Sequence, residues 1–222
     1  MTKQINILST KKLLPNQKQE LVNANINLIE EDFIQTKIKN FELSKVNKNL
    51  IFTSQNAVQS ILNHPKFEEL KSKDIFSIGM KTKDLLTENG FNVVAYTGYA
   101  ADLAEIISLI YSEESFTFFS GNLRRDVLPN TLKENGITFN EIEVYETELT
   151  SKKIKEKLDG ILFFSPSAVE SYLKLNSIKD ETCFCIGETT AETLENKKIK
   201  NIIIADKPSV EHVINEVIEY YI

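Results

Sequence analysis

Hydroxyl, amide and glycine residues follow a series of short apolar runs in this 222-residue chain. Each apolar run has the length of a buried strand, and each polar group precedes an amphipathic segment with the spacing of a helix. In open parallel sheets, ligands bind at the carboxyl ends of strands, where helix starts offer unpaired N–H groups and a positive dipole end. The pattern predicts anion binding at 9–11, 53–56, 79–82, 120–122, 165–167 and 187–190.

Helix capping is the competing explanation for each of these positions, because Ser, Thr and Asn are ordinary N-cap residues. A single helix terminus stabilises an anion by only about 0.3–1 kcal/mol. Six such positions in one chain therefore favour a ligand with several carboxylates or phosphates over capping alone.

Motifs for cofactor or metal chemistry are missing from the sequence. There is no Walker A loop, no dinucleotide-binding glycine pattern after a strand and no nucleophile elbow. His64 and His212 lie far apart in the sequence, and Cys183 and Cys185 would face the same side of a buried strand as inert thiols. If the protein is an enzyme, we expect it to act by binding and orientation, without metal or organic cofactor.

Composition narrows the class of partner and the compartment. The formal net charge of −6 argues against general affinity for nucleic acid or anionic membranes. No apolar run approaches the roughly 20 residues of a membrane helix, and no signal-peptide pattern follows Met1. We therefore expect a cytoplasmic protein.

An internal repeat sets the expected architecture. The segment 50–82 is similar to the segment 161–190, so that Ser54 aligns with Ser165 and Thr82 with Thr190. Alternating strands and helices imply parallel sheets with right-handed crossovers. A repeat of this size predicts two similar α/β lobes with a cleft between them.

The order of the elements predicts a discontinuous first lobe, 1–34 with 148–222, and an inserted second lobe, 38–144. A two-stranded connector would cross between them near 33–38 and 143–149. Gly90 is expected to follow a helix end in the C′ position. The strands are predicted at 5–8, 26–29, 50–53, 74–78, 91–95, 116–119, 160–164, 182–186 and 201–205, and the helices at 16–24, 55–62, 80–88, 101–110, 123–134, 151–157, 166–174, 188–196 and 208–220.

Five sequence motifs, spread in order along nearly the whole chain, resemble those of the uroporphyrinogen-III synthase family. The features are Phe52-Thr53-Ser54-x-x-Ala57-Val58, Ile78-Gly79-x-x-Thr82, Gly121-Asn122-Leu123-Arg124-Arg125-x-x-Leu128, Val144-Tyr145-x-Thr147, and the pair Phe164-Ser165-Pro166-Ser167 with Ile186-Gly187-x-Thr189-Thr190-Ala191.

The resemblance implies two α/β lobes joined by a two-stranded antiparallel connector. It also implies a cyclising hydro-lyase that closes hydroxymethylbilane, a linear tetrapyrrole, with inversion of the last ring to give uroporphyrinogen III. No cofactor is implied. We expect a monomer that makes transient contact with the enzyme supplying hydroxymethylbilane.

Site residues follow from the matched motifs. The resemblance implies that Tyr145 assists departure of the substrate hydroxyl, although a packed connector tyrosine is the alternative. Thr82 and Thr190 would donate to carboxylate arms. Further substrate-binding candidates are Ser54, Ser165, Thr189, Gly121, Asn122, Arg124 and Lys11, the last standing where many relatives carry arginine.

Two other functions remain open. A non-catalytic two-lobed module that binds an anionic metabolite would keep the helix-terminus sites and would not need Tyr145. A two-lobed glycosyltransferase is disfavoured by the small lobes and the missing nucleotide motif.

Overall fold

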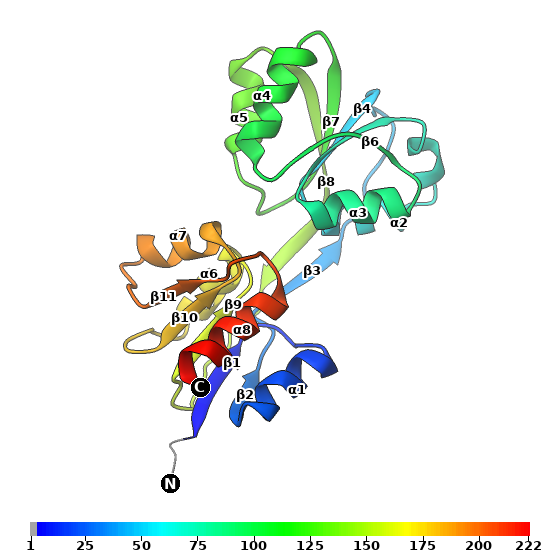
Figure 1. Cartoon of the computed structure of the whole chain (residues 1–222). Coiled ribbons are helices and arrows are strands. Elements are labelled where there is room, and N and C mark those ends of the chain that lie inside the picture. The colour runs from blue at the N-terminus through cyan, green and yellow to red at the C-terminus, as the bar shows by residue number, and fades with distance from the viewer. Residues whose placement is uncertain (1–3) are drawn as a thin grey trace. The chain divides into compact units, whose positions relative to one another are not determined.

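A computed structural model describes residues 4–222 and divides them into two compact α/β units (Figure 1). Unit 1 comprises the residues up to Gln35 together with Glu148–Ile222, and unit 2 comprises Thr36–Thr147. The chain enters unit 2 through β3 (Ile34–Ile38) and returns to unit 1 at the end of β8 (Thr138–Leu149). Parallel sheets flanked by helices confirm the predicted fold class.

Unit 1 contains a parallel sheet in the strand order β11-β10-β9-β1-β2. Its first βαβ segment comes from the start of the chain and the remainder from the end, so segments far apart in sequence share one sheet. The elements are β1 (Ile5–Ser9), α1 (Pro15–Asn23), β2 (Ile26–Glu30), β9 (Gly160–Phe163), α6 (Pro166–Leu173), β10 (Thr182–Cys185), α7 (Glu188–Asn196), β11 (Ile202–Ile204) and α8 (Val210–Tyr221).

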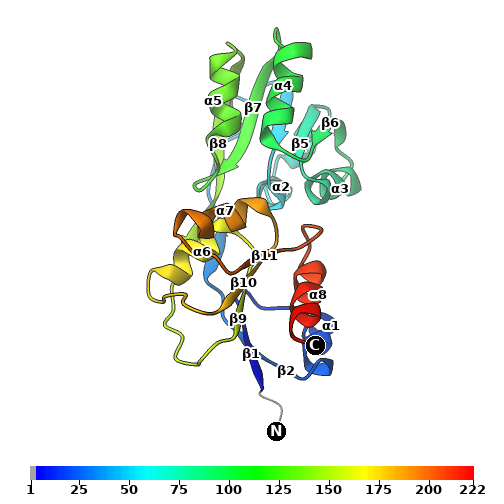
Figure 2. The same cartoon turned by 60° about the vertical axis from the view of Figure 1, so that its left-hand side comes forward.

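Two apolar clusters cover the two faces of this sheet. Residues along each strand alternate between the faces, so Ile161 and Phe163 pack under α6 and α7 while Leu162 packs under α1 and α8. Figure 2 shows these two pairs of helices on opposite sides of the strands.

Cys183 and Cys185 are both fully buried in the cluster under α6 and α7, as free thiols. The sequence prediction of buried thiols on one strand face is confirmed. Burial raises the pKa of Cys183 to about 12 and shifts the pKa of Cys185 upward as well.

We expect both thiols to resist a disulfide reagent at pH 8 in the native protein, because thiolate is the reactive form and neither side chain contacts solvent. Spectrophotometric titration should count no reactive thiol in buffer and two in denaturant. Rapid labelling of either cysteine in the folded protein would show that this face of the sheet is open.

Unit 2 contains a sheet in the order β3-β8-β7-β4-β5-β6, parallel from β8 to β6. β3 runs antiparallel to β8, since Lys39 N–H donates to Val144 O whereas Thr150 N–H donates to Phe33 O. The other elements are β4 (Asn49–Phe52), α2 (Gln55–Leu62), the 3-10 helix η1 (Phe67–Leu70), β5 (Asp74–Ile78), α3 (Met80–Glu88), β6 (Asn92–Thr97), α4 (Ala100–Ile110), β7 (Ser115–Gly121) and α5 (Val127–Glu134).

Helices again cover both faces of the unit 2 sheet. Leu50 and Phe52 face the cluster formed with α2, α3 and η1, and Ile51 faces the cluster formed with α4 and α5. Gly90 follows the end of α3 with a φ of +81°, the left-handed geometry that suits a glycine in the C′ position. The sequence prediction for this helix end is confirmed.

The two units share one strand topology, with different chain ends. Strands β6-β5-β4-β7-β8 of unit 2 have the same neighbours as β11-β10-β9-β1-β2 of unit 1. In unit 1 the element order is circularly permuted, because the β1-α1-β2 segment precedes the inserted unit 2 in the chain. The internal repeat in the sequence corresponds to the β-α-β-α-β segments starting at β4 and β9.

The prediction of a helix at 151–157 is wrong, because this segment has no helical turn. It carries four lysines and a single large apolar residue, Ile154, which is a poor pattern for a packed helix. Asn176 holds the extended backbone instead: its Oδ1 accepts from Ile154 N–H at 2.9 Å, and its Nδ2 donates to Lys152 O at 2.7 Å.

The predicted helix at 123–134 begins four residues later, at Val127. A turn precedes it, in which Arg124 N–H donates to Gly121 O at 3.1 Å. The Arg124 side chain pairs with Glu141 of β8 and with Asp126. These ion pairs hold the turn against the edge of the sheet. Because they are tertiary contacts, the periodicity of the sequence does not predict the later start of the helix.

Candidate functional site

The carboxyl edge of the unit 2 sheet gathers several predicted site residues. Neighbouring strands β7, β4 and β5 end at Gly121, Phe52 and Ile78, so the segments after them lie side by side. Ser54 is the N-cap of α2, and its hydroxyl accepts from Asn56 N–H at 3.1 Å. Helix capping therefore explains the presence of a serine at position 54. Ser165, which aligns with Ser54 in unit 1, is likewise an N-cap.

Thr82 lies in the first turn of α3 and is 5% exposed. Its N–H donates to the carbonyl of Gly79, whose φ of +84° turns the chain between β5 and α3. This tight turn brings the start of α3 close to the strand end. The Thr82 side chain therefore lies at this edge of the sheet and is almost fully buried.

The carboxyl edge of unit 1 repeats this arrangement. Ser165 caps α6 and accepts from Ala168 N–H at 3.2 Å. Thr190 is 1% exposed in the first turn of α7, and its N–H donates to Gly187 O at 3.0 Å. Thr189, one residue earlier, is half-buried. The alignment of Ser54 with Ser165 and of Thr82 with Thr190 therefore holds in three dimensions within each unit.

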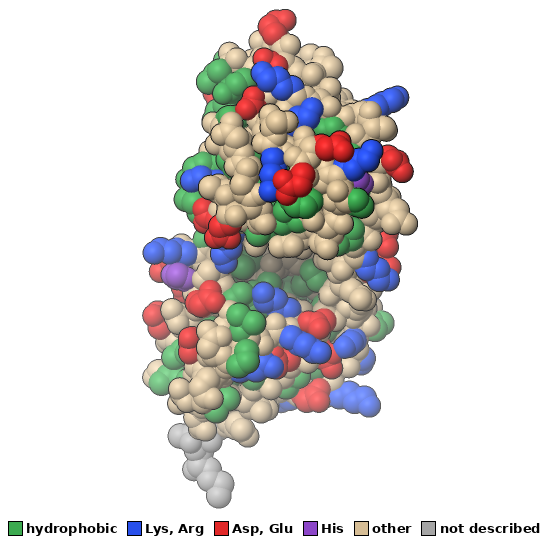
Figure 3. All heavy atoms as spheres, turned by 90° about the vertical axis from the view of Figure 1, so that its right-hand side faces the viewer, with side chains coloured by type: hydrophobic (Ala, Val, Ile, Leu, Met, Phe, Trp, Pro, Cys, Tyr) green, Lys and Arg blue, Asp and Glu red, His purple; other side chains and the backbone are tan. Residues whose placement is uncertain are grey.

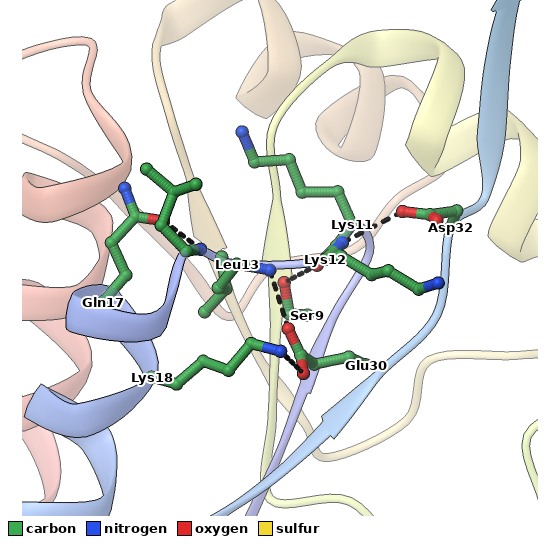
Figure 4. Close-up of polar contacts among 9 residues, drawn as sticks. Ser9, Lys11, Lys12, Leu13, Gln17, Lys18, Glu30 and Asp32 are labelled. Carbon is green, nitrogen blue, oxygen red and sulfur yellow. Dashed lines mark hydrogen bonds and ion pairs between the residues drawn. The ribbon is translucent and has the colours of Figure 1, made fainter.

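Lys11 lies in the segment after β1, also at the unit 1 edge. Glu30 accepts from Leu13 N–H at 2.7 Å and Asp32 accepts from Lys12 N–H at 2.9 Å, so carboxylates hold the backbone of this segment. The Lys11 side chain points away from both acids (Figure 4), and its Nζ lies 4.8 Å from the centre of the Phe164 ring.

Tyr145 lies on β8, with its ring directly against the backbone of Gly121. A Cβ added to Gly121 would stand 2.3 Å from Cζ and 2.8 Å from the hydroxyl oxygen of Tyr145. The ring is partly buried against the cluster under α2 and α3. In the part of the chain that is described, no hydrogen bond to the Tyr145 hydroxyl occurs.

Asn122 bridges the same two strands with its side chain. Its Oδ1 accepts from Thr147 N–H at 2.8 Å, and its Nδ2 donates to Thr147 O at 3.3 Å. Both polar ends of the amide therefore bind the backbone of β8. The structure therefore brings Gly121, Asn122 and Tyr145 together. The sequence analysis named all three residues but did not predict that they lie next to one another.

Arg124 lies beside this group in an acidic pocket. Its Nε and Nη2 donate to the two carboxylate oxygens of Glu141 at 2.7 and 3.1 Å, and Nη1 donates to Asp126. Burial alone would raise the pKa of Glu141, but hydrogen bonds from Arg124 and Ser120 lower it. The guanidinium is therefore committed to the protein's own acids. The pocket is lined by Gly121, Asn122, Arg124, Asp126, Glu141 and Glu143.

Charged side chains are otherwise mixed over the surface. Figure 3 shows lysines interspersed with acidic residues on both units, without a continuous basic area on the face drawn. Across residues 4–222, no three His, Cys, Asp or Glu side chains come close enough to hold a metal ion. No helix in the same range has the length and apolar character needed to cross a bilayer.

Comparison with known proteins finds one family over most of the chain. The family described as uroporphyrinogen-III synthase HemD matches residues 24–215. The chain is 27% identical over 195 residues to a uroporphyrinogen-III synthase of Chlorobaculum parvum, covering 77% of this chain and 79% of the relative. It is 25% identical over 216 residues to the Saccharomyces cerevisiae uroporphyrinogen-III synthase, covering 78% and 75%.

Solved structures support the fold. The uroporphyrinogen-III synthetase of Helicobacter pylori 26695 superposes with a TM-score of 0.74 at 24% identity, covering 98% of this chain and all of that one. A mutant uroporphyrinogen III synthase of Thermus thermophilus gives a TM-score of 0.67 at 13% identity, with 98% of both chains covered.

Proposed function

Because the chain belongs to the uroporphyrinogen-III synthase family, we propose that it closes hydroxymethylbilane to uroporphyrinogen III with inversion of the last pyrrole ring. The match over residues 24–215 carries this proposal, since it includes both strand-end threonines and the tyrosine of β8. Tyr145 favours the enzyme over a passive binding module, because its hydroxyl faces no partner among residues 4–222.

The reaction breaks the C–O bond of the substrate's hydroxymethyl group and releases water. The methylene carbon then bonds to the already substituted carbon of the last ring, giving a spiro intermediate. The bond from that carbon to its original bridging methylene breaks and re-forms at the free α carbon of the same ring. That carbon loses its proton, which restores the proton given to the leaving hydroxyl, and the last ring is inverted. Holding the folded chain in this geometry can contribute up to about 7–11 kcal/mol to lowering the barrier. Without such restraint, the linear tetrapyrrole closes without inversion.

Tyr145 acts as the proton donor in this proposal. A tyrosine phenol is protonated at neutral pH, so it can donate to the leaving hydroxyl and is a poor general base. The ring lies in the space that a side chain at position 121 would occupy. General acid assistance of this kind typically contributes about 10²–10⁴ in rate.

The strand-end residues bind the acetate and propionate arms. Thr82 and Thr190 lie in the first turns of α3 and α7 at the carboxyl edges, where helix N-termini favour carboxylates. Thr189 and Lys11 add a hydroxyl and a positive charge at the unit 1 edge. We leave Arg124 out of this set, because Glu141 and Asp126 already accept from its guanidinium.

Loss of water with ring closure makes the enzyme a cyclising hydro-lyase, and orientation plus one proton donor requires no cofactor. We further propose a cytoplasmic monomer, consistent with its two free thiols, that takes its unstable substrate from the supplying enzyme in a transient contact.

With freshly prepared hydroxymethylbilane and a chelator present, the purified protein should form the type III isomer. The reason is that every step in the proposal uses only protein groups. Chromatography of the oxidised porphyrins separates the isomers. Type I product alone, formed at the rate seen without protein, would reject the enzyme and leave the anion-binding module.

A further inference from the structure

A β-bulge turns Tyr145 toward the sheet face that α2 and α3 cover. Ser120 of β7 pairs with Glu143, but the next residue, Gly121, pairs with Tyr145, so Val144 is an extra residue on β8. Consecutive strand residues normally point to opposite faces. Here Val144 and Tyr145 both pack against the cluster under α2 and α3.

Gly121 provides the space that the redirected ring needs. An added Cβ would stand 2.3 and 2.4 Å from Cζ and Cε2 of Tyr145, distances at which one group must move. The Tyr145 ring, and not the backbone conformation, requires a glycine at position 121. Among the described residues, Gly121 is not one of the glycines with a positive φ, so its backbone conformation is open to other residues.

Asn122 holds the strands together immediately beyond the bulge. Its two hydrogen bonds to the backbone of Thr147 replace the ladder bonds that end at Gly121. Thr147 lies two residues after Tyr145, so these bonds limit movement of the backbone that carries the phenol.

We propose that Gly121 and Asn122 are positioning residues that set the location of the Tyr145 hydroxyl, and that they do not bind substrate themselves. The inference rests on the proposed role of Tyr145 and deepens it. It also replaces the sequence-based hypothesis that both residues contact the substrate, since the Gly121 surface is covered by the ring and the Asn122 amide is engaged at both ends.

The first test is Gly121→Ala, alone and combined with Tyr145→Phe. Alanine should displace the ring and lower kcat about 10–100-fold with KM little changed, because a misplaced catalytic group loses rate rather than binding. In the Tyr145→Phe background the same substitution should have no further effect on kcat. An equal loss in both backgrounds would overturn the inference by showing that Gly121 acts independently of the hydroxyl.

Gly98→Ala is the matched control, because nothing lies within 4 Å of its added Cβ. It should leave kcat, KM and thermal unfolding unchanged. Asn122→Ala is the second variant, in case Gly121→Ala folds poorly. We expect a smaller decrease in kcat that also vanishes in the Tyr145→Phe background, whereas a raised KM alone would assign Asn122 to substrate binding and contradict the proposal.

A measurement without substrate separates this inference from the proposed function. Nuclear Overhauser contacts between the Gly121 Hα protons and the Tyr145 ring should be present in the wild type and lost in Gly121→Ala. Their absence in the wild type would overturn the positioning role whatever the activity. If they are present but only type I product forms, the proposed function fails and the contact stands. A wild-type kcat in Tyr145→Phe would show that the hydroxyl has no catalytic role, and would overturn the proposal that Gly121 and Asn122 position it for catalysis. The proposed reaction itself would still stand.

Discussion

Replacing Tyr145 by phenylalanine is expected to lower kcat about 100-fold, near the low end of the range for general acid assistance. The low end applies because the substrate's hydroxyl leaves readily and water can partly replace the phenol. The change removes one oxygen and keeps the ring that packs against Gly121 and the cluster under α2 and α3. Product affinity and the free energy of unfolding should therefore stay near their wild-type values.

Initial-rate and single-turnover measurements check this result. Thr82→Val is the comparison variant: loss of its hydroxyl should raise KM for substrate while affecting kcat less, because it is proposed to bind a carboxylate arm. The two variants thus separate a proton donor from a binding group. If Tyr145→Phe turns over at the wild-type rate, the tyrosine is a packing residue of β8.

Truncating Phe76 to alanine is expected to destabilise unit 2 by about 3–5 kcal/mol. The side chain is fully buried and stands edge-on to two rings, Tyr111 at 4.9 Å and Phe116 at 5.2 Å between centroids. Its cluster lies under α4 and α5, on the sheet face opposite the one where Tyr145 packs. The molecules that remain folded should keep the wild-type kcat.

Urea unfolding followed by circular dichroism measures the loss. Phe76→Leu fills most of the space and should cost less than about 1.5 kcal/mol. Leu109→Ala is the surface control, since this side chain is 74% exposed and its truncation should stay within about 0.5 kcal/mol. A loss below about 1 kcal/mol for Phe76→Ala would contradict the close packing of the three rings.

Strand and helix positions were largely predictable because they depend on local periodicity. The predictions for α2, α3, α7 and β5 match the observed bounds, and the N-cap serines of α2 and α6 were recognisable from their place before amphipathic runs. The absent helix at 151–157 shows the limit of this reasoning. There the deciding contacts come from Asn176, more than twenty residues away in the chain.

The candidate site was predictable only as a set of strand ends. Residues at the carboxyl ends of parallel strands share an edge whatever the details of packing. Within those strand-end segments, Thr82 and Thr190 were chosen from the resemblance to the family. The availability of each side chain was not predictable in the same way. Arg124 carries the right charge for a carboxylate arm, yet Glu141 and Asp126 bind it in the fold.

The sequence by itself determined the two-unit α/β architecture and the family, because hydrophobic periodicity and ordered motifs are properties of the chain. Only the tertiary structure decided the direction of Tyr145. A strand of regular alternation would turn Tyr145 away from the face that Val144 occupies, and the bulge places both on one face. That bulge depends on the pairing of β7 with β8 and on a glycine at the contact, so it arises from two strands together and from neither alone.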